Sequence, residues 1–147
     1  TNGASKITFT IVPDDYHIAL KHRNHLGVMT STPLALGPSG ASLDLRAAST
    51  PTYGTNARAA AFGRAPLWAG DVNADEVLKY TGSGNDRDPI LVAIGGATPN
   101  NTISGYRSED VNMDGEVKYT GANNDRDPIL VNIGGATPNN FRDAQLP

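Results

Sequence analysis

Apolar and polar residues alternate within residues 5–46, which is the pattern of half-buried β-strands. Turns rich in Pro, Gly, Ser and Asp separate the strand-like runs, which lie at 7–11, 16–20, 26–29, 34–36 and 43–45. Short strands joined by tight turns predict an antiparallel sheet that forms half of a β-sandwich-like unit.

Residues 47–66 are rich in Ala, Thr, Gly and Pro and show little periodicity, which is typical of a connector. We expect a turn of helix near residues 56–61. Trp68, the only tryptophan, directly precedes the next pattern. We interpret it as a packing anchor between two units, with an exposed sugar-binding ring as the alternative. The chain is therefore expected to divide into residues 1–66 and residues 67–147.

The second unit is a tandem repeat, because residues 71–101 recur almost verbatim at 110–140, a shift of 39. Each copy runs from a polar loop into Asp-Arg-Asp-Pro, a sequence that favours a helix start. Apolar residues at helical spacing follow, and a Gly-Gly pair ends each helix. One such helix cannot bury its apolar stripe alone, so we expect the two copies to pack face to face with pseudo-twofold symmetry. With the N-terminal strands, this predicts an α+β fold.

Each copy opens with oxygen-bearing side chains at positions 1, 3 and 5, an alternation with which a short loop wraps a hard cation. An EF-hand-type loop adds a backbone carbonyl at position 7 and a closing acid. The apolar residue at position 8 is expected to pair the two loops as a short β-bridge. The sequence therefore predicts two Ca²⁺ sites, with these candidate ligands: Asp71, Asn73, Asp75, the carbonyl of Val77, Asp86 and Asp88 in the first copy, and Asp110, Asn112, Asp114, the carbonyl of Glu116, Asp125 and Asp127 in the second.

Two features depart from a regular loop of this kind. Position 6 is Gly115 in the second copy but Glu76 in the first. A non-glycine residue in this sharp turn costs roughly 1 kcal/mol, so we expect the first site to be the weaker one. Position 12 is a glycine in both copies, so an insertion delays the closing acid. In each Asp-Arg-Asp, one Asp is expected to reach the ion while the other caps the helix. Asn85 and Asn124 are weaker candidate ligands.

Composition and charge narrow the classes of function. The chain of 147 residues is 38% hydrophobic and has no cysteine, so metal ions rather than disulfides would staple a small module. A net charge of −3 argues against a nucleic-acid partner. No apolar run approaches the ~20 residues of a membrane helix. We find no cysteine nucleophile, phosphate loop, nucleophile elbow or zinc motif, and we predict that the chain is not an enzyme. No signal peptide is visible and the chain does not begin with Met, so we interpret it as a mature product or a piece of a longer chain.

The loops resemble a dockerin-type duplicated calcium-binding module, and DVNMDG at 110–115 is the most specific stretch. More closely, the duplicated blocks KYTG, NDRDPIL and IGG, the ending QLP and the upstream KHRNHLGVMT resemble the C-terminal region of large secreted proteins of Bacteroidetes-type bacteria. The N-terminal strands resemble the last strands of a prealbumin-like sandwich. The resemblance implies an extracellular or cell-surface location, calcium dependence and no catalysis. The insertion before the closing acid departs from dockerins. Missing first strands would leave an edge that another chain could fill.

Several features carry alternative interpretations. The Asp/Asn loops could be polar turns without an ion. Residues three apart in a strand point to opposite faces, so His22 and His25 are interpreted as a solvated strand end, with a polar contact to a partner or a metal site as alternatives. The duplicated Lys-Tyr-Thr is interpreted as a tyrosine packed over the inserted loop, with a recognition patch as the alternative. Asn100 begins an N-glycosylation sequon that chance also explains.

We therefore expect an extracellular, non-catalytic, calcium-stabilised structural module. Its partners are expected to be proteins, either through self-association as a surface or filament subunit or through docking to a scaffold or cell envelope. A carbohydrate-binding accessory domain with a polysaccharide partner is a third alternative. Self-association is the first expectation, and docking is its alternative.

Overall fold

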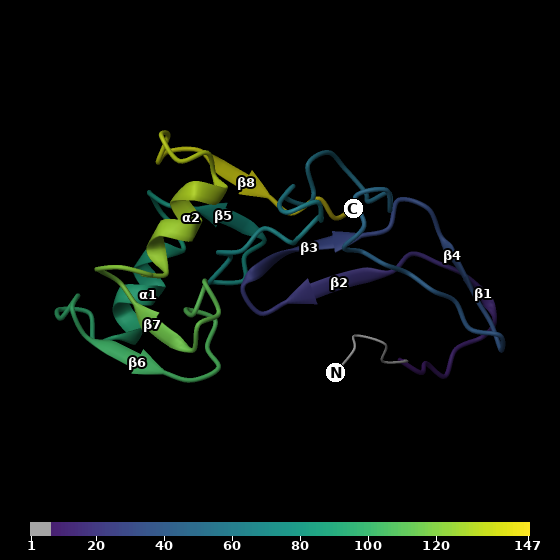
Figure 1. The fold of residues 1–147 in the computed structure, drawn as a ribbon, viewed down its shortest axis with the longest axis horizontal. Helices are drawn as coiled ribbons and strands as arrows, with labels where there is room; N and C mark the ends of the chain where they lie inside the picture. Colours follow the sequence, from purple (N-terminus) through teal and green to yellow (C-terminus); the bar gives the residue numbers. More distant parts are fainter. Residues whose placement is uncertain (1–6) are drawn as a thin grey trace.

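The computed structural model describes residues 7–147 and has a mixed α+β fold, which confirms the predicted class (Figure 1). Within this part of the chain, the strands form four separate two-stranded antiparallel sheets. The elements in chain order are β1 (Asp14–Tyr16), β2 (Ala19–His22), β3 (His25–Met29), β4 (Leu34–Leu36), β5 (Val77–Lys79), α1 (Arg87–Ala93), β6 (Thr102–Ser104), β7 (Glu116–Lys118), α2 (Arg126–Asn132) and β8 (Phe141–Asp143).

The N-terminal strands lie in two small sheets. Strand β1 pairs with β4, and β2 pairs with β3 as a hairpin whose turn is Arg23 and Asn24. Figure 1 shows β1 and β4 at one end of an elongated molecule, the repeats at the other end, and the hairpin between them. The expected strands at 26–29 and 34–36 are confirmed as β3 and β4. The two sheets are not joined, so residues 7–147 show no sandwich.

Two expected strands and one expected helical turn do not form. The runs at 7–11 and 43–45 contain no strand, and residues 56–61 contain no helix. Alternation specifies which side chains share a face but supplies no neighbouring strand, so Ile7 and Phe9 stay 77% and 59% exposed. Ser5 and Lys6, the start of the expected β region, lie outside the described residues.

The repeats form the expected helices. Each begins at the Asp-Arg-Asp-Pro sequence and ends at its glycine pair, where Gly95 and Gly96 have φ of 114° and 69°. Each repeat buries equivalent isoleucines in one shared core: Ile90 in α1 and Ile129 in α2, and Ile94 and Ile133 directly after these helices. The buried cluster also contains Val72 and Val111 from the loops, Leu78 from β5, Val117 from β7 and Leu26 from β3, and Trp68 packs against it.

The repeats exchange strands, which the sequence did not predict. Strand β6, which follows α1, pairs with β7 of the second loop, and β8, which follows α2, pairs with β5 of the first loop. The residues at position 8 therefore lie opposite Arg142 and Ile103. The expected β-bridge between the two loops was wrong, because each loop strand already has a partner from the other repeat. Neither helix of residues 7–147 is long and apolar enough to cross a membrane.

Asn24 joins the N-terminal hairpin to both repeats. The side chain is fully buried, and its Nδ2 donates to the carbonyls of Ser108 at 2.9 Å and Asp110 at 2.7 Å. The backbone carbonyl of Asn24 accepts a hydrogen bond from the N–H of Gly70 at 2.8 Å. One residue thus holds the start of both loops.

This contact also explains one difference between the repeats. Asn132 Nδ2 donates to the carbonyl of Ala69 at 2.8 Å. The equivalent carbonyl in the second repeat is that of Ser108, which Asn24 already satisfies. The equivalent of Asn132 in the first repeat can therefore be Ala93, which has no amide group.

We expect Asn24→Ala to lower the free energy of unfolding by about 2–4 kcal/mol, because the buried carbonyl of Asp110 and the half-buried carbonyl of Ser108 lose their donor. Asn24→Asp keeps the shape of the side chain but not its amide donor, and should destabilise at least as much. Urea unfolding measures both. A loss below about 0.5 kcal/mol in either variant, the range of ordinary surface substitutions, would contradict this role.

Candidate metal centre

Backbone amides draw the oxygens of each polar loop inward. In the first loop, the N–H of Asp75 donates to Asp71 Oδ1 at 3.1 Å and to Asn73 Oδ1 at 3.0 Å, and the N–H of Val77 donates to Asp75 Oδ1 at 3.0 Å. The side chains at positions 1, 3 and 5 therefore face one small region. Polar turns without an ion predict the same hydrogen bonds, so these bonds alone do not identify a cation site.

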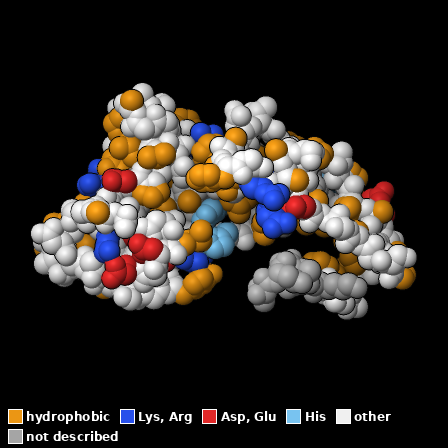
Figure 2. Space-filling view, in the orientation of Figure 1, with side chains coloured by type: hydrophobic (Ala, Val, Ile, Leu, Met, Phe, Trp, Pro, Cys, Tyr) orange, Lys and Arg blue, Asp and Glu red, His pale blue; other side chains and the backbone are white. Residues whose placement is uncertain are grey.

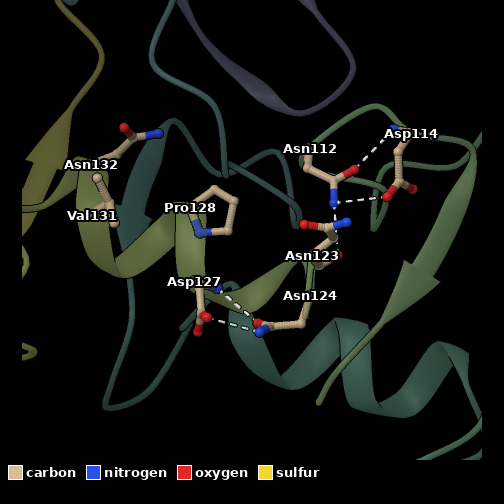
Figure 3. Close-up of a pocket in the computed structure, with 8 residues that line it drawn as sticks. All are labelled: Asn112, Asp114, Asn123, Asn124, Asp127, Pro128, Val131 and Asn132. Carbon is tan, nitrogen blue, oxygen red and sulfur yellow. Dashed lines mark hydrogen bonds between the residues drawn. The ribbon is translucent and has the colours of Figure 1, made fainter. Parts of the chain in front are cut away.

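The second loop repeats the arrangement. The N–H of Gly115 donates to Asp110 Oδ2 at 3.2 Å, and that of Asp114 donates to Asn112 Oδ1 at 2.8 Å. Figure 3 shows Asn112 and Asp114 turned toward each other above an open surface cavity. Val77 and Glu116, whose carbonyls are candidate ligands, are the first residues of β5 and β7.

The first loop carries the backbone strain that the sequence predicts. Glu76 has φ of 67°, in the left-handed region, and Gly115 takes the same turn with φ of 91°. Position 4 is left-handed in both copies as well, at Ala74 and Met113. The cost of a non-glycine residue at position 6 falls on the first loop alone.

The first Asp of each Asp-Arg-Asp lies at the helix start but makes no capping hydrogen bond. Asp86 is instead fully buried and binds the loop: Oδ1 accepts from the N–H groups of Val72 at 2.8 Å and Asn73 at 3.4 Å, and Oδ2 accepts from that of Lys79 at 2.8 Å. Asp125 makes the equivalent three bonds in the second copy. Each of these carboxylates ties the loop, the following strand and the helix together.

The asparagine before each pair caps the helix. Asn85 Oδ1 accepts from the N–H of Asp88 at 2.9 Å, and Asn85 Nδ2 donates to Asp88 Oδ2 at 2.8 Å. Asn124 and Asp127 make the same reciprocal pair (Figure 3). The expectation that an Asp caps the helix was wrong. Asp and Asn are both good caps, and spacing alone does not say which of them reaches the free N–H.

The structure brings some of the candidate ligands together and leaves others apart. Asp86 lies close enough to Asp71 for their charges to repel, as does Asp125 to Asp110. The side chains of Asp88 and Asp127 are 60% exposed and lie beside neighbouring arginines. Within residues 7–147, no three acidic or histidine side chains converge as a metal cluster.

One atom of the second loop fits a cation. Asp110 is buried, and its Oδ1 has no hydrogen-bond partner in the described part of the chain. A buried acceptor without a partner is costly, and a cation would satisfy it. The side chains around it offer carboxylate and amide oxygens, which suit Ca²⁺.

Burial also shifts the acidity of the loop carboxyls. It raises the pKa of Asp86 to about 7; three backbone N–H groups counteract this shift, and the charge of Asp71 adds to it. The pKa values of Asp71 and Asp125 are also raised, chiefly by burial and further by Asp75 and Asp110 respectively. A cation among these groups would relieve the repulsion.

His22 and His25 face each other, contrary to the expectation of opposite faces. They flank a two-residue hairpin turn rather than lying along one strand, so they pair across β2 and β3 with their Nδ1 atoms 2.8 Å apart. Burial, then the neighbouring His22 and Arg23, lowers the pKa of His25 to about 4. Figure 2 shows histidine side chains at the surface between the repeats and the N-terminal strands.

Comparisons of the chain with protein-family models, with curated proteins and with solved structures found no match.

Two groups titrate in opposite senses here, because the lowered pKa of His25, about 4, makes the fold less stable as the pH falls. In a His25→Gln background, which removes that contribution, we expect the metal-free protein to become more stable as the pH falls from about 7.5 to about 5. The folded pKa of Asp86 lies above its ordinary value of about 4, so ionisation of this group opposes folding above pH 4 and does so fully above pH 7. Thermal unfolding in calcium-free buffer measures the effect. A melting temperature that decreases as the pH is lowered from about 7.5 to about 5 would contradict this expectation.

Proposed function

We propose that the chain is a non-catalytic structural module in which each repeat loop binds one Ca²⁺. The observation that carries the proposal is the buried Asp110 Oδ1, which has no hydrogen-bond partner in the described residues and lies in a loop of carboxylate and amide oxygens. The raised pKa of Asp71 supports the same role in the first loop, because burial beside Asp75 leaves its charge uncompensated.

The proposed ligands are the oxygens that the repeat supplies at positions 1, 3, 5 and 7, together with a closing acid. Two kinds of acid stand at the closing position. Asp86 and Asp125 are buried and engaged by backbone N–H groups, whereas Asp88 and Asp127 are exposed and adjacent to the helix cap. We assign the closing role to Asp88 and Asp127, because turning either side chain toward an ion gives up one hydrogen bond from the capping asparagine and one arginine contact, whereas Asp86 and Asp125 would give up three backbone hydrogen bonds each.

The two sites are proposed to differ in affinity. Glu76 holds a left-handed conformation that favours glycine, and the cost is roughly 1 kcal/mol. The first loop must keep this conformation to bind an ion. The second loop has Gly115 at the same position and binds more tightly on this ground alone.

Assembly is the second part of the proposal. The exposed alternating run at 7–11 has no strand partner within residues 7–147, and such a run can add to a sheet of another chain. This supports self-association at an extracellular surface and a sandwich-like N-terminal unit completed by another copy. The division at residues 66 and 67 stays a prediction, as does the alternative of docking to a scaffold, which rests on the dockerin-like loops.

The alternative of carbohydrate binding has less support. Arginine side chains lie over Trp68, Tyr80, Tyr106 and Tyr119, at 3.7–5.1 Å from the ring centroids. In each of these rings an arginine occupies one face, which leaves a sugar only the opposite face.

We expect calcium to raise the melting temperature and calorimetry to detect two sites of different affinity. Binding to the native state alone contributes about 2.7 kcal/mol per site at 100 times its dissociation constant. Asp71→Asn and Asp110→Asn should each remove one site. Asp143→Asn removes an exposed acid outside both loops and should remove none.

Variants of the paired acids separate their roles. Asp127→Asn should weaken calcium binding with little effect on the metal-free protein. Asp125→Asn should destabilise the metal-free protein by about 1–3 kcal/mol, because an amide group then faces backbone donors. Unchanged melting on addition of calcium or EGTA would contradict the proposed function. In the same samples, polymers that sediment with calcium and dissolve in EGTA would support self-association, and a compact monomer would favour docking.

A further inference from the structure

The turn of the N-terminal hairpin places a cation beside the second loop. The Arg23 guanidinium lies over the Tyr106 ring, 3.8 Å from its centroid, and its Nε donates to the carbonyl of Arg107 at 2.7 Å. These two contacts fix the side chain against the segment that leads into Asp110.

Arg23 forms an ion pair with the first residue of the loop. Its Nη2 lies 3.6 Å from Asp110 Oδ2, and the two side chains are only 17% and 4% exposed. A pair this well covered is screened less by water and salt than a surface pair. Arg23, Asp110 and Asp114 also line one open surface cavity, so the guanidinium stands where an ion would approach the loop.

The first loop has no such pair. The contact from the hairpin to that loop is Lys21 with Glu76, at 2.5 Å between highly exposed side chains. Among the ion pairs of residues 7–147, none includes Asp71, which is the counterpart of Asp110. At position 1, the hairpin therefore supplies a counter-charge to the second loop but not to the first.

We propose that Arg23 is a built-in counter-cation of Asp110 that competes with Ca²⁺ for the second loop. This inference rests on the proposed function. Without calcium, the guanidinium neutralises a buried carboxylate and supports the fold. With calcium on Oδ1, the same guanidinium on the Oδ2 side repels the ion. The N-terminal hairpin thus lowers the affinity of the second loop and offsets the advantage that Gly115 gives it.

The test compares calcium affinities by calorimetry in low salt. Arg23→Gln should tighten calcium binding at the second loop about threefold to tenfold, the range expected for a partly screened charge at this distance. Arg23→Lys keeps the charge and should stay within about twofold of the parent protein. Arg107→Gln removes a neighbouring charge that forms no ion pair in the described structure and should also change little.

Two backgrounds assign the effect to one loop. In Asp75→Ala, which disables the first loop, Arg23→Gln should still tighten binding. In an Asp114→Ala background, which disables the second loop, Arg23→Gln should leave the calcium affinity unchanged. The metal-free Arg23→Gln protein should also melt at a lower temperature, because Asp110 loses its counter-charge, and both changes should shrink at high salt.

The outcomes separate this inference from the proposal beneath it. If the parent protein binds calcium and Arg23→Gln binds with equal affinity, the inference is overturned and the proposed function stands. If Arg23→Gln binds more weakly, Arg23 orients the carboxylate instead of competing with the ion, and the inference is again overturned. If neither the parent protein nor any variant binds calcium, the inference and the proposed function are both overturned.

Discussion

The fold of the repeats depends on one interaction that occurs twice, a buried carboxylate held by three backbone N–H groups. Asp86 and Asp125 reach back 14 residues to the start of their own loops and also bind the strand that follows. Each thereby fixes loop, strand and helix in one arrangement, although neither helix is longer than seven residues. Helices this short are unstable alone, so their order has to come from contacts of this kind and from the shared isoleucine core.

The same interaction explains why a cation fits this fold. Burying a carboxylate raises the free energy of its charged form, and hydrogen bonds offset only part of that cost for Asp86. Asp71 and Asp110 add a second negative charge near each buried carboxylate. Strand exchange joins the two repeats, because β5 pairs with β8, which follows the second repeat, and β7 pairs with β6, which follows the first. A divalent ion in one loop would stabilise a strand pair that contains both copies.

The features that depend on local sequence pattern could be predicted from the sequence. The features that depend on a contact with a distant segment could not. The duplicated helices, their glycine ends and the turns of the polar loops were predictable from spacing and from residue type. The run at 7–11 has a strand pattern but no strand, because alternation cannot supply a neighbour. His22 and His25 were misjudged because a hairpin turn between them changes which faces they share. The role of the Asn24 side chain could not be predicted, because the carbonyls to which its amide donates lie 84 and 86 residues away.

The central claim is that each repeat loop holds one calcium ion, and counting bound ions tests it most directly. Native mass spectrometry of the protein in calcium, compared with the protein after EGTA and buffer exchange, gives that number without a model of binding. The account predicts two ions per chain, and one ion per chain in each of Asp71→Asn and Asp110→Asn. A chain that carries no calcium at millimolar concentration would contradict the account.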